Sequence, residues 1–454
     1  MNHDNTRELL VNAASRSADY LDGLENRSVS PVTGSVERLV TALEGPIPDT
    51  PVEAGEILSF IDEYGSPATV ASAGGRYYGF VTGGALPATL AAQYLAAAWD
   101  QNSFNYLSSP AIAAFEDAAL RQLKQILNLP AEAAGAFVTG ATMANFTCLA
   151  AARNQVLKQV DWDVDAEGLF GAPPVTVVLG EEAHGSIYKV LSMLGLGRDR
   201  VLVVPADDQG RMRADALPVI TGPCIVCIQA GNVNSGAFDP ALEIIEWARE
   251  GNAWVHVDGA FGLWALVSPD HAGLARDFIA ADSWATDAHK WLNVPYDSGI
   301  AIIRNQQALK AAMSVSGAYL LATDQRDAID YTPDSSRRAR ALEIWVALNT
   351  LGHSGLADLV RRNCQQASYM ADALAAAGVE VMNEVVLNQV VVCFGSDDRS
   401  RQVIAAIQNA GVCWCGGTNW HGRMAMRISF SSWATTDDDV ARSLESILDA
   451  HSSN

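Results

Sequence analysis

The sequence predicts an α/β fold with a mostly parallel β-sheet flanked by helices. From about residue 110 onward, short apolar segments alternate with helical segments. Strands that are apolar throughout and alternate with helices are typical of a parallel sheet covered on both faces. The predicted strands are GAFVTG, PVTVVLG, RVLVVP, CIVCIQA, AWVHVD, SWATD and GIAII, and the longest helix between them begins near Thr142.

Changes in this pattern along the chain predict three regions. Residues 1–60 carry helical periodicity broken by GPIPDTP, whose prolines end helices or bend the chain, and they are interpreted as an amino-terminal helical arm. Residues 61–315 form the predicted large domain. In residues 316–454 a polar loop leads into helices from Arg338 to Ala377, and the segments VEVMN, NQVVVCF and MAMRISF follow with a helix between them. This last region is predicted to be a smaller α+β domain.

Composition and charge narrow the classes of partner. The chain has 454 residues, of which 49% are hydrophobic, so it can bury a large core. Its formal net charge of −22 repels phosphate backbones and anionic membranes, so neither nucleic acid nor a membrane is an expected partner. The start MNHDNTRELL has no apolar signal core and no segment is apolar for long enough to span a bilayer, which favours a cytoplasmic protein.

The seven cysteines do not form the spacing of a disulfide framework. CIVC, from Cys224 to Cys227, lies in a predicted buried strand, and no second CxxC or histidine pair at zinc spacing accompanies it. CWC, from Cys413 to Cys415, is the other close pair. We therefore expect reduced thiols and no metal site.

Small and polar residues follow the predicted strands, and ligands of such sheets bind beyond the carboxyl ends of the strands. Gly140, Ala141 and Thr142 lie at a strand-to-helix junction, where backbone N–H groups could approach a phosphate. The same residues also begin many helices that bind nothing. His184 follows the next strand and could stack on an aromatic ligand or move a proton, although a lone histidine at such a position is more often structural.

Two further strand ends carry polar side chains. Asn232 and Asn234 lie in the segment IQAGNVNSGAFDP, where they could donate hydrogen bonds to a ligand or stabilise a turn. Asp258 ends the strand AWVHVD, so its carboxylate is expected to be desolvated and to need a cation nearby. Either a helix-capping role or a partner with a protonated ring nitrogen would explain a carboxylate at this position.

Lys290 lies among apolar residues in SWATDAHKWLN. Since burying an ammonium group without a partner is costly, Lys290 is either a turn residue or a group held inside for chemistry, such as imine formation with an aldehyde. A class I aldolase would share this lysine. An imine-forming lysine, an anion seat, a carboxylate and an imidazole together match pyridoxal 5′-phosphate. No GxSxG, Walker A or HExxH pattern supports a hydrolase, nucleotide or zinc-protease interpretation.

At these residues the sequence resembles the group II pyridoxal-phosphate-dependent amino-acid decarboxylases, which include aromatic-L-amino-acid and glutamate decarboxylases. The resemblance runs in family order from about residue 75 to about residue 350. It implies a fold-type-I enzyme, similar to aspartate aminotransferase, that forms a homodimer with the amino-terminal arm packed on the other subunit. The matching segments are RYYGFVTGG, SPAIAAFED, TGATMANFTCLAAAR, HGSIYK, HVDGAFG, ADSWATDAHKWLNVPYDSG and SRRARALEIW.

The resemblance also implies a role for each strand-end residue. Lys290 would carry the internal aldimine, Asp258 would pair with the pyridine nitrogen, and His184 would stack on the ring. The other implied cofactor contacts are Ala141 and Thr142 at the phosphate with help from His289, Ala260 under the ring, and Asn232 where the family often has Thr.

The implied reaction is decarboxylation of an L-amino acid to an amine and CO2, a lyase reaction of amino-acid metabolism. In the family a mobile-loop tyrosine protonates the resulting carbanion, and the matching residue here is Tyr331 in DAIDYTPDSSRR, although its spacing to the arginine pair is shorter than in the animal enzymes. Tyr331 could equally be an ordinary loop residue. Aldehyde synthesis, aminotransfer and aldol cleavage therefore stay open, as does a protein that forms a lysine imine without the cofactor.

The substrate side chain is expected to be bulky or aromatic. Tyr77, Tyr78 and Phe80 match a region that lines the substrate pocket in the aromatic-acid enzymes, and the alternative for them is aromatic packing in the core. Trp414 and Trp420 are two more aromatic residues that could reach the interface between subunits. Arg427 in MAMRISF could clamp a substrate carboxylate, as in aminotransferases, or form a structural ion pair.

Overall fold

The computed structural model describes residues 6–314 and 325–453 of the chain. It divides into two compact units. The first unit comprises Met1–Thr82, Tyr369–Met382 and Val391–Asn454, and the second comprises Gly83–Ser368 and Asn383–Val390. This division groups the arm with the carboxyl-terminal segments, and the boundary predicted between residues 315 and 316 lies outside the described residues.

The second unit contains a seven-stranded sheet with the order β1-β7-β6-β5-β4-β2-β3. Strand β7 is antiparallel to both β1 and β6, and the other neighbours are parallel, so six of the seven strands run in one direction. The predicted α/β fold with a mostly parallel sheet is confirmed. The bounds are β1 Ala134–Val138, β2 Thr176–Gly180, β3 Leu202–Val204, β4 Cys224–Gln229, β5 Trp254–Asp258, β6 Ser283–Asp287 and β7 Gly299–Ile303.

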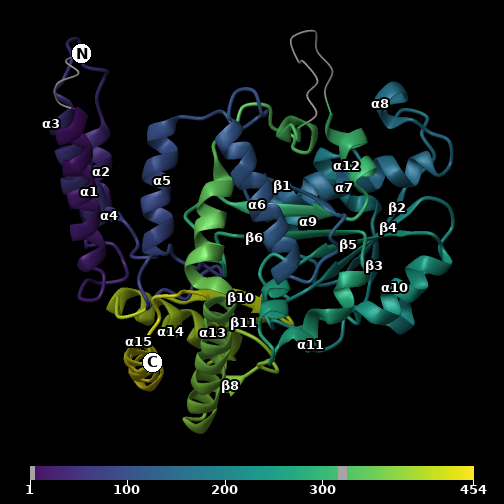
Figure 1. Cartoon of the computed structure of the whole chain (residues 1–454). Coiled ribbons are helices and arrows are strands. Elements are labelled where there is room, and N and C mark those ends of the chain that lie inside the picture. The colour runs from purple at the N-terminus through teal and green to yellow at the C-terminus, as the bar shows by residue number, and fades with distance from the viewer. Residues whose placement is uncertain (1–5, 315–324, 454) are drawn as a thin grey trace. The chain divides into compact units, whose positions relative to one another are not determined.

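Helices cover both faces of this sheet. In Figure 1, α7 (Ala141–Lys158) and α12 (Gln306–Met313) lie above the sheet, and α10 (Ala241–Glu250) lies below it. Helix α7 packs against β5, β6 and β7 and also against α9 (Gly185–Met193) and α12. Because it is surrounded on most sides, α7 is rich in small and apolar residues and has no broad polar face. Its amino terminus is thereby fixed at the end of β1.

The remaining helices of the second unit include one that extends into the first. Helix α13 (Arg340–Ala376) agrees with the predicted helical region and is interrupted at Gly352, where φ is +60°. Glycine adopts this left-handed conformation without the steric cost that a side chain imposes. The others are α5 Pro87–Trp99, α6 Pro110–Ile126, α8 Val164–Glu167 and α11 Ala272–Ala275.

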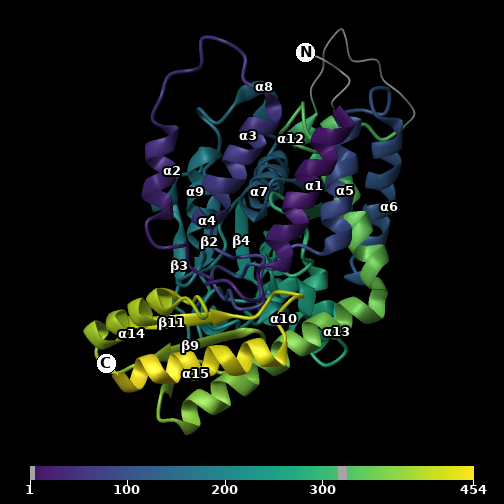
Figure 2. The same ribbon diagram turned by 90° about the vertical axis from the view of Figure 1, so that its left-hand side faces the viewer.

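The first unit begins with helices, as the predicted arm requires. They are α1 Thr6–Asp22, α2 Ser35–Leu43, α3 Ala54–Phe60 and α4 Ser66–Ala68. Its sheet has the order β10-β11-β9-β8. In Figure 2, helices α14 (Asp397–Ala410) and α15 (Asp437–Ser453) lie beside this sheet. The bounds are β8 Glu380–Val381, β9 Gln389–Cys393, β10 Gly416–Trp420 and β11 Arg423–Ser429.

Strand β10 was not predicted from the sequence. Its sequence, GGTNW, lacks both a run of apolar residues and an alternating pattern. It pairs with β11 across the two-residue loop His421–Gly422, in which both residues have positive φ (52° and 74°). Such loops match the twist of two antiparallel strands, so the turn and its partner strand define β10.

All seven cysteines are buried and none is in a disulfide, with Cys224 and Cys227 in β4 as the sequence predicts. Within residues 6–314 and 325–453, no helix has the length and apolar character needed to cross a membrane. The same ranges contain no group of three or more His, Cys, Asp and Glu side chains arranged to hold a metal ion.

Candidate active site

The carboxyl ends of the parallel strands meet at one edge of the seven-stranded sheet, and the predicted cofactor residues follow them. Ala141 and Thr142 begin α7 after β1, and Asp258 is the last residue of β5. Because β1, β2, β4, β5 and β6 run in one direction, residues directly after them lie along the same edge. The others at this edge are His184 after β2, Asn232 after β4, Ala260 after β5, and His289 and Lys290 after β6.

Asp258 is a buried carboxylate with one oxygen left for a partner. Its residue is 7% exposed, and Asn145 Nδ2 lies 3.4 Å from Asp258 Oδ2. Asp258 Oδ1 is buried and has no hydrogen-bond partner among the described residues. Burial raises the pKa of Asp258, and the charges of His184 and Lys290 oppose that rise. A buried oxygen of this kind is suited to a donor from a ligand, such as a protonated ring nitrogen.

Lys290 is held inside by Asp287, a residue that the sequence analysis did not single out. Lys290 Nζ lies 2.9 Å from Asp287 Oδ2, and the two side chains are 20% and 3% exposed. The ion pair explains how the ammonium group tolerates this degree of burial. The available signal for Asp287 was its position, at the end of a predicted strand and three residues before the lysine.

Asp287 also reaches the predicted phosphate seat. Its Oδ1 accepts a hydrogen bond of 2.6 Å from the Ala141 backbone N–H and lies 3.5 Å from His289 Nε2. The approach is close, because a Cβ atom at Gly140 would lie 3.2 Å from His289 Cε1 and one at Gly299 would overlap the backbone of Gly140. The amino terminus of α7 is therefore joined to the lysine turn through one carboxylate.

His289 has a defined orientation at this edge. Its Nδ1 accepts a hydrogen bond of 3.1 Å from the Ser298 N–H, so the proton of the neutral ring is on Nε2, which faces Asp287. The ring of Tyr296 lies 4.3 Å from the His289 ring, centroid to centroid. Burial lowers the pKa of His289, which keeps the imidazole neutral near pH 7.

The structure places His184 and Asn232 in local structural roles. His184 caps α9, with Nδ1 accepting from the Ser186 N–H at 3.2 Å, and its residue is exposed. Asn232 Oδ1 accepts from the backbone N–H groups of Asn234 and Ser235 at 2.8 and 3.2 Å. Asn232 thus stabilises its own turn, which was the structural alternative for it. The cofactor contacts of both residues stay predictions.

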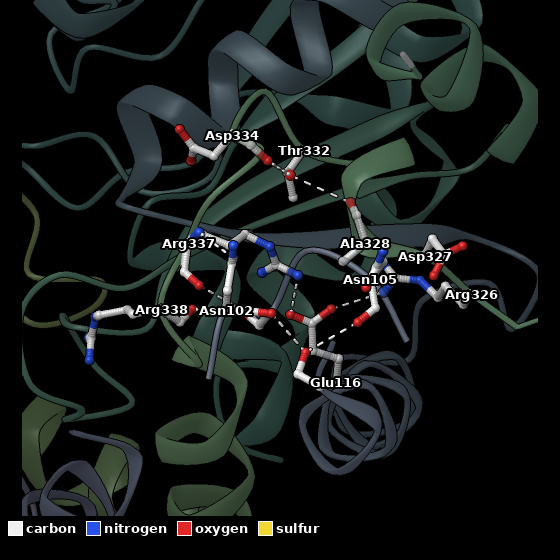
Figure 3. Close-up of polar contacts among 12 residues, drawn as sticks. Asn102, Asn105, Glu116, Arg326, Asp327, Ala328, Thr332, Asp334, Arg337 and Arg338 are labelled. Atoms are coloured by element: carbon white, nitrogen blue, oxygen red, sulfur yellow. Dashed lines mark hydrogen bonds and ion pairs between the residues drawn. The ribbon is translucent and has the colours of Figure 1, made fainter. Parts of the chain in front are cut away.

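Tyr331 lies in the sequence between Arg326 and Arg337, and both arginines form ion pairs that hold this segment (Figure 3). Arg326 and Arg337 both pair with Glu116, which is 2% exposed. Tyr331 itself is 3% exposed, accepts a 2.7 Å hydrogen bond from Gln306 Nε2 and has the Arg326 guanidinium 4.2 Å from its ring centroid. Its contacts are therefore with this segment and α12 rather than with Lys290. Its role as proton donor stays a prediction.

The predicted substrate residues lie in the first unit. Tyr78 is 1% exposed, packs on Phe430 at 4.9 Å between ring centroids and has its hydroxyl group 3.1 Å from Ser443 Oγ. Tyr77 is also buried and stacks on Trp414. Phe80 is 64% exposed, with its ring centroid 5.5 Å from that of Trp414. Tyr77 and Tyr78 thus pack in the core, whereas Phe80 presents an aromatic face.

Two further candidates also lie in the first unit. Trp420 is fully buried at the end of β10 and packs with Ala425 and Val391. Arg427 lies within β11, and burial lowers the pKa of its guanidinium. A guanidinium stays charged even so, which agrees with either the carboxylate clamp or the structural ion pair.

The residues at the sheet edge fit pyridoxal 5′-phosphate. Lys290 offers a primary amine, Asp258 Oδ1 is a buried acceptor, and the amino terminus of α7 offers backbone N–H groups to an anion. The exposed imidazole of His184 offers a flat surface on the same edge. Each of the four chemical demands of the cofactor thus has a matching group in the second unit.

Comparisons with known proteins show the family and the fold of the chain. The model of the pyridoxal-dependent decarboxylase conserved domain matches residues 72–396. An L-2,4-diaminobutyrate decarboxylase of Rhizobium meliloti is 30% identical over 384 residues, which cover 80% of this chain and 75% of that protein. An aromatic-L-amino-acid decarboxylase of Bacillus atrophaeus is 26% identical over 359 residues, or 76% and 72% of the two chains. The crystal structure of Oryza sativa TDC with PLP and tryptamine superposes with a TM-score of 0.91 at 22% identity, covering 100% of this chain and 99% of that one, and shares the fold.

Proposed function

We propose that this chain, which belongs to the pyridoxal-dependent decarboxylase family, holds its cofactor covalently through Lys290 and acts on an L-amino acid with a bulky or aromatic side chain. The chain is an amino-acid decarboxylase, a carboxy-lyase that depends on pyridoxal 5′-phosphate. The observation that carries the site assignment is the pair of strand ends at β5 and β6. One leaves a buried carboxylate oxygen for a donor, and the other holds a lysine beside a carboxylate.

The bound cofactor supplies an electron sink that takes up the electron pair released when the bond to the carboxyl group breaks. Asp258 accepts a hydrogen bond at Oδ1 and keeps the proton on the atom that it faces. Asp287 holds the ammonium form of Lys290 at the sheet edge whenever that amine is released. His184 would supply a flat ring at the same edge, and Ala141, Thr142 and His289 would contact the phosphate. In the structure, the Ala141 N–H and His289 Nε2 face Asp287 instead.

A second candidate reaction is decarboxylation coupled to oxidation by dioxygen, which consumes O2 and water and yields CO2, an aldehyde, ammonia and hydrogen peroxide. The observation that favours it is the position of Tyr331, whose hydroxyl group is engaged with Gln306 and whose ring packs on Arg326. A site without a proton donor in reach would deliver the proton slowly, which would leave time for reaction with dioxygen. Decarboxylation to the amine stays the first proposal, because the matching family model and the relatives are decarboxylases.

The proposed substrate class rests on Phe80 and Trp414. Phe80 is exposed and its ring lies beside that of Trp414, so the two form an aromatic surface. Aromatic rings of this kind contribute a large contact area to a flat apolar side chain. The relatives differ in substrate, since one decarboxylates L-2,4-diaminobutyrate and another acts on aromatic L-amino acids.

We also propose that the protein is a cytoplasmic homodimer. The helices of the first unit expose several large apolar side chains, which is costly in water and typical of a surface that a second copy covers. Light scattering on the purified protein would give the mass of a dimer, and the mass of a monomer would contradict the proposal. In α1 and α2 these residues are Leu10, Val11, Val40 and Leu43, and Ile47 in the segment after α2 is also exposed.

The experiment that tests the reaction is incubation of the holoenzyme with each common L-amino acid, with CO2, amine, aldehyde and ammonia measured together. The proposal predicts equal amounts of amine and CO2, fastest with an aromatic amino acid. Aldehyde with ammonia would support the second candidate, and a keto acid without CO2 would contradict both. The K290A variant is the control for reaction outside this site.

A further inference from the structure

A continuous chain of buried hydrogen bonds leads through the second unit to Asp258. Trp254 Nε1 donates to Ser283 Oγ at 2.8 Å, and Ser283 Oγ lies 2.9 Å from His256 Nδ1. His256 Nε2 lies 2.8 Å from Asn145 Oδ1, and Asn145 Nδ2 lies 3.4 Å from Asp258 Oδ2. All five residues are buried, none more than 7% exposed.

The fold brings these residues together by simple periodicity. Trp254, His256 and Asp258 alternate along β5, so their side chains lie on the same face of the sheet. Ser283 is the first residue of the neighbouring strand β6, and it is paired with His256. Asn145 lies in the second turn of α7, which packs across that face.

The two end residues of this series, Trp254 and Asp258, determine the direction of every hydrogen bond in it. The Trp254 indole N–H can only donate, and an ionised Asp258 can only accept. Asn145 therefore turns its amide N–H toward Asp258 and its oxygen toward His256, so the His256 proton is on Nε2. Burial lowers the pKa of His256 to about 3, so the ring is neutral and its Nδ1 accepts from the Ser283 hydroxyl group. Each proton in the chain thus points toward Asp258.

We propose that Ser283, His256 and Asn145 are positioning residues that hold Asp258 in its ionised form with Oδ1 directed at the cofactor ring nitrogen. The inference rests on the proposed function and adds residues to it. This series of hydrogen bonds gives Asp258 a neutral donor at Oδ2. The negative charge of Asp258 therefore stays available to a cation at Oδ1. An arginine at position 145 would hold the carboxylate more tightly but would also compete with the ring nitrogen. Donors linked in series polarise one another, so Ser283 acts on Asp258 across two intervening side chains.

The alternative role is purely structural, with His256 present only to satisfy buried polar groups. The pair H256Q and H256N separates the two roles, because the amide nitrogen of glutamine reaches the position of Nε2, whereas that of asparagine reaches only the position of Nδ1. Two properties of the holoenzyme are measured, namely the dissociation constant of pyridoxal 5′-phosphate and the 15N chemical shift of the pyridine nitrogen of labelled cofactor. Thermal unfolding of each variant reports the structural role separately.

The proposal predicts that H256N moves the ring-nitrogen shift toward the unprotonated value and weakens cofactor binding about tenfold. H256Q is expected to stay closer to the parent protein in both properties. A parental shift and affinity in H256N would overturn the proposal, even if its melting temperature falls. If H256N does not fold, S283A decides the question, since it frees Nδ1 to take the proton, and a parental ring-nitrogen shift in S283A would overturn the proposal.

Measurements on the parent protein distinguish a failure of this inference from a failure of the proposed function. A parent that does not bind the cofactor would contradict the proposed function itself. A parent with a protonated ring nitrogen, together with a parental shift in both H256N and S283A, would leave the proposed function intact and remove these residues from it.

Discussion

Glu116 and Asp258 are two buried carboxylates of the same unit with opposite surroundings. Glu116 is 2% exposed and pairs with two guanidinium groups, those of Arg326 and Arg337 (Figure 3). Asp258 is 7% exposed, accepts a long hydrogen bond from the Asn145 amide and leaves Oδ1 without a side-chain partner among the described residues. The carboxylate of Glu116 is fully paired within the chain, whereas the carboxylate of the proposed site has one oxygen available to a donor from a ligand.

This difference has a cost in free energy. Burying a charge without a full set of partners destabilises the folded state, and the raised pKa of Asp258 reflects that cost. A paired carboxylate such as Glu116 instead becomes costly when one partner is removed, because the remaining charges stay buried. Substitutions at the two positions should therefore separate stability from activity.

The largest effect on stability is expected from E116Q. The substitution leaves the guanidinium of Arg337, whose side chain is 1% exposed, without a buried counter-charge. We expect the free energy of unfolding to fall by about 3–5 kcal/mol, measured by urea unfolding, with kcat of the folded fraction close to that of the parent.

A matched control for E116Q is E380Q in the first unit. Glu380 also binds an arginine through both oxygens, with Arg423 at 2.6 Å from each, but the two side chains are 50% and 40% exposed. Since exposed pairs contribute little, E380Q should change the free energy of unfolding by less than about 1 kcal/mol. Equal losses in the two variants would show that burial does not distinguish these ion pairs.

D258N should give the reverse result. A neutral amide cannot hold a proton on the ring nitrogen, so kcat/KM is expected to fall by about 10²–10³. The free energy of unfolding of the cofactor-free protein should not fall, because an incompletely paired buried charge is removed. Steady-state kinetics and urea unfolding check the two halves, and a loss of stability without a loss of activity would place Asp258 with Glu116 among the structural carboxylates.

Asp239 is a third buried carboxylate, and its titration is expected to make the stability of the protein depend on pH. It is 5% exposed and accepts backbone hydrogen bonds from Gln229 and Met212 at 2.7 and 2.8 Å. Burial raises its pKa from 3.8 to about 6. Between these values the folded protein keeps a proton that the unfolded chain has lost, so this group makes stability fall as pH rises from about 4 to about 6.

The expected size of this fall is about 3 kcal/mol, and the full cost is present above pH 6. The D239N variant lacks the titration, so the difference in unfolding free energy between variant and parent should change by this amount across the window. Unfolding curves at pH 4, 5, 6 and 7 measure it. Parallel pH profiles for the two proteins would show that Asp239 does not titrate in this range.

The sequence predicted those parts of the molecule that local patterns determine. Apolar strands and the polar residues at their ends are local features, so the sheet and the placement of Asp258 and Lys290 beside one edge followed from the sequence. The hydrogen-bond and ion-pair partners of these residues could not be predicted from the sequence. Asn145 and His256 lie inside an apolar helix and an apolar strand, where nothing in the sequence marks them as polar contacts of Asp258. Glu116 meets Arg326 and Arg337 across 210 and 221 residues, and only the folded chain shows such a pair.

Lys290 is proposed to bind the cofactor at the edge of the sheet. The chain has five lysines, at positions 124, 158, 189, 290 and 310, so attachment can be mapped without ambiguity. The holoenzyme is reduced with borohydride, digested and analysed by mass spectrometry. We expect the reduced cofactor on the peptide that contains Lys290 and none on K290A. Attachment to another lysine in the parent protein would rule out Lys290 as the cofactor-binding residue.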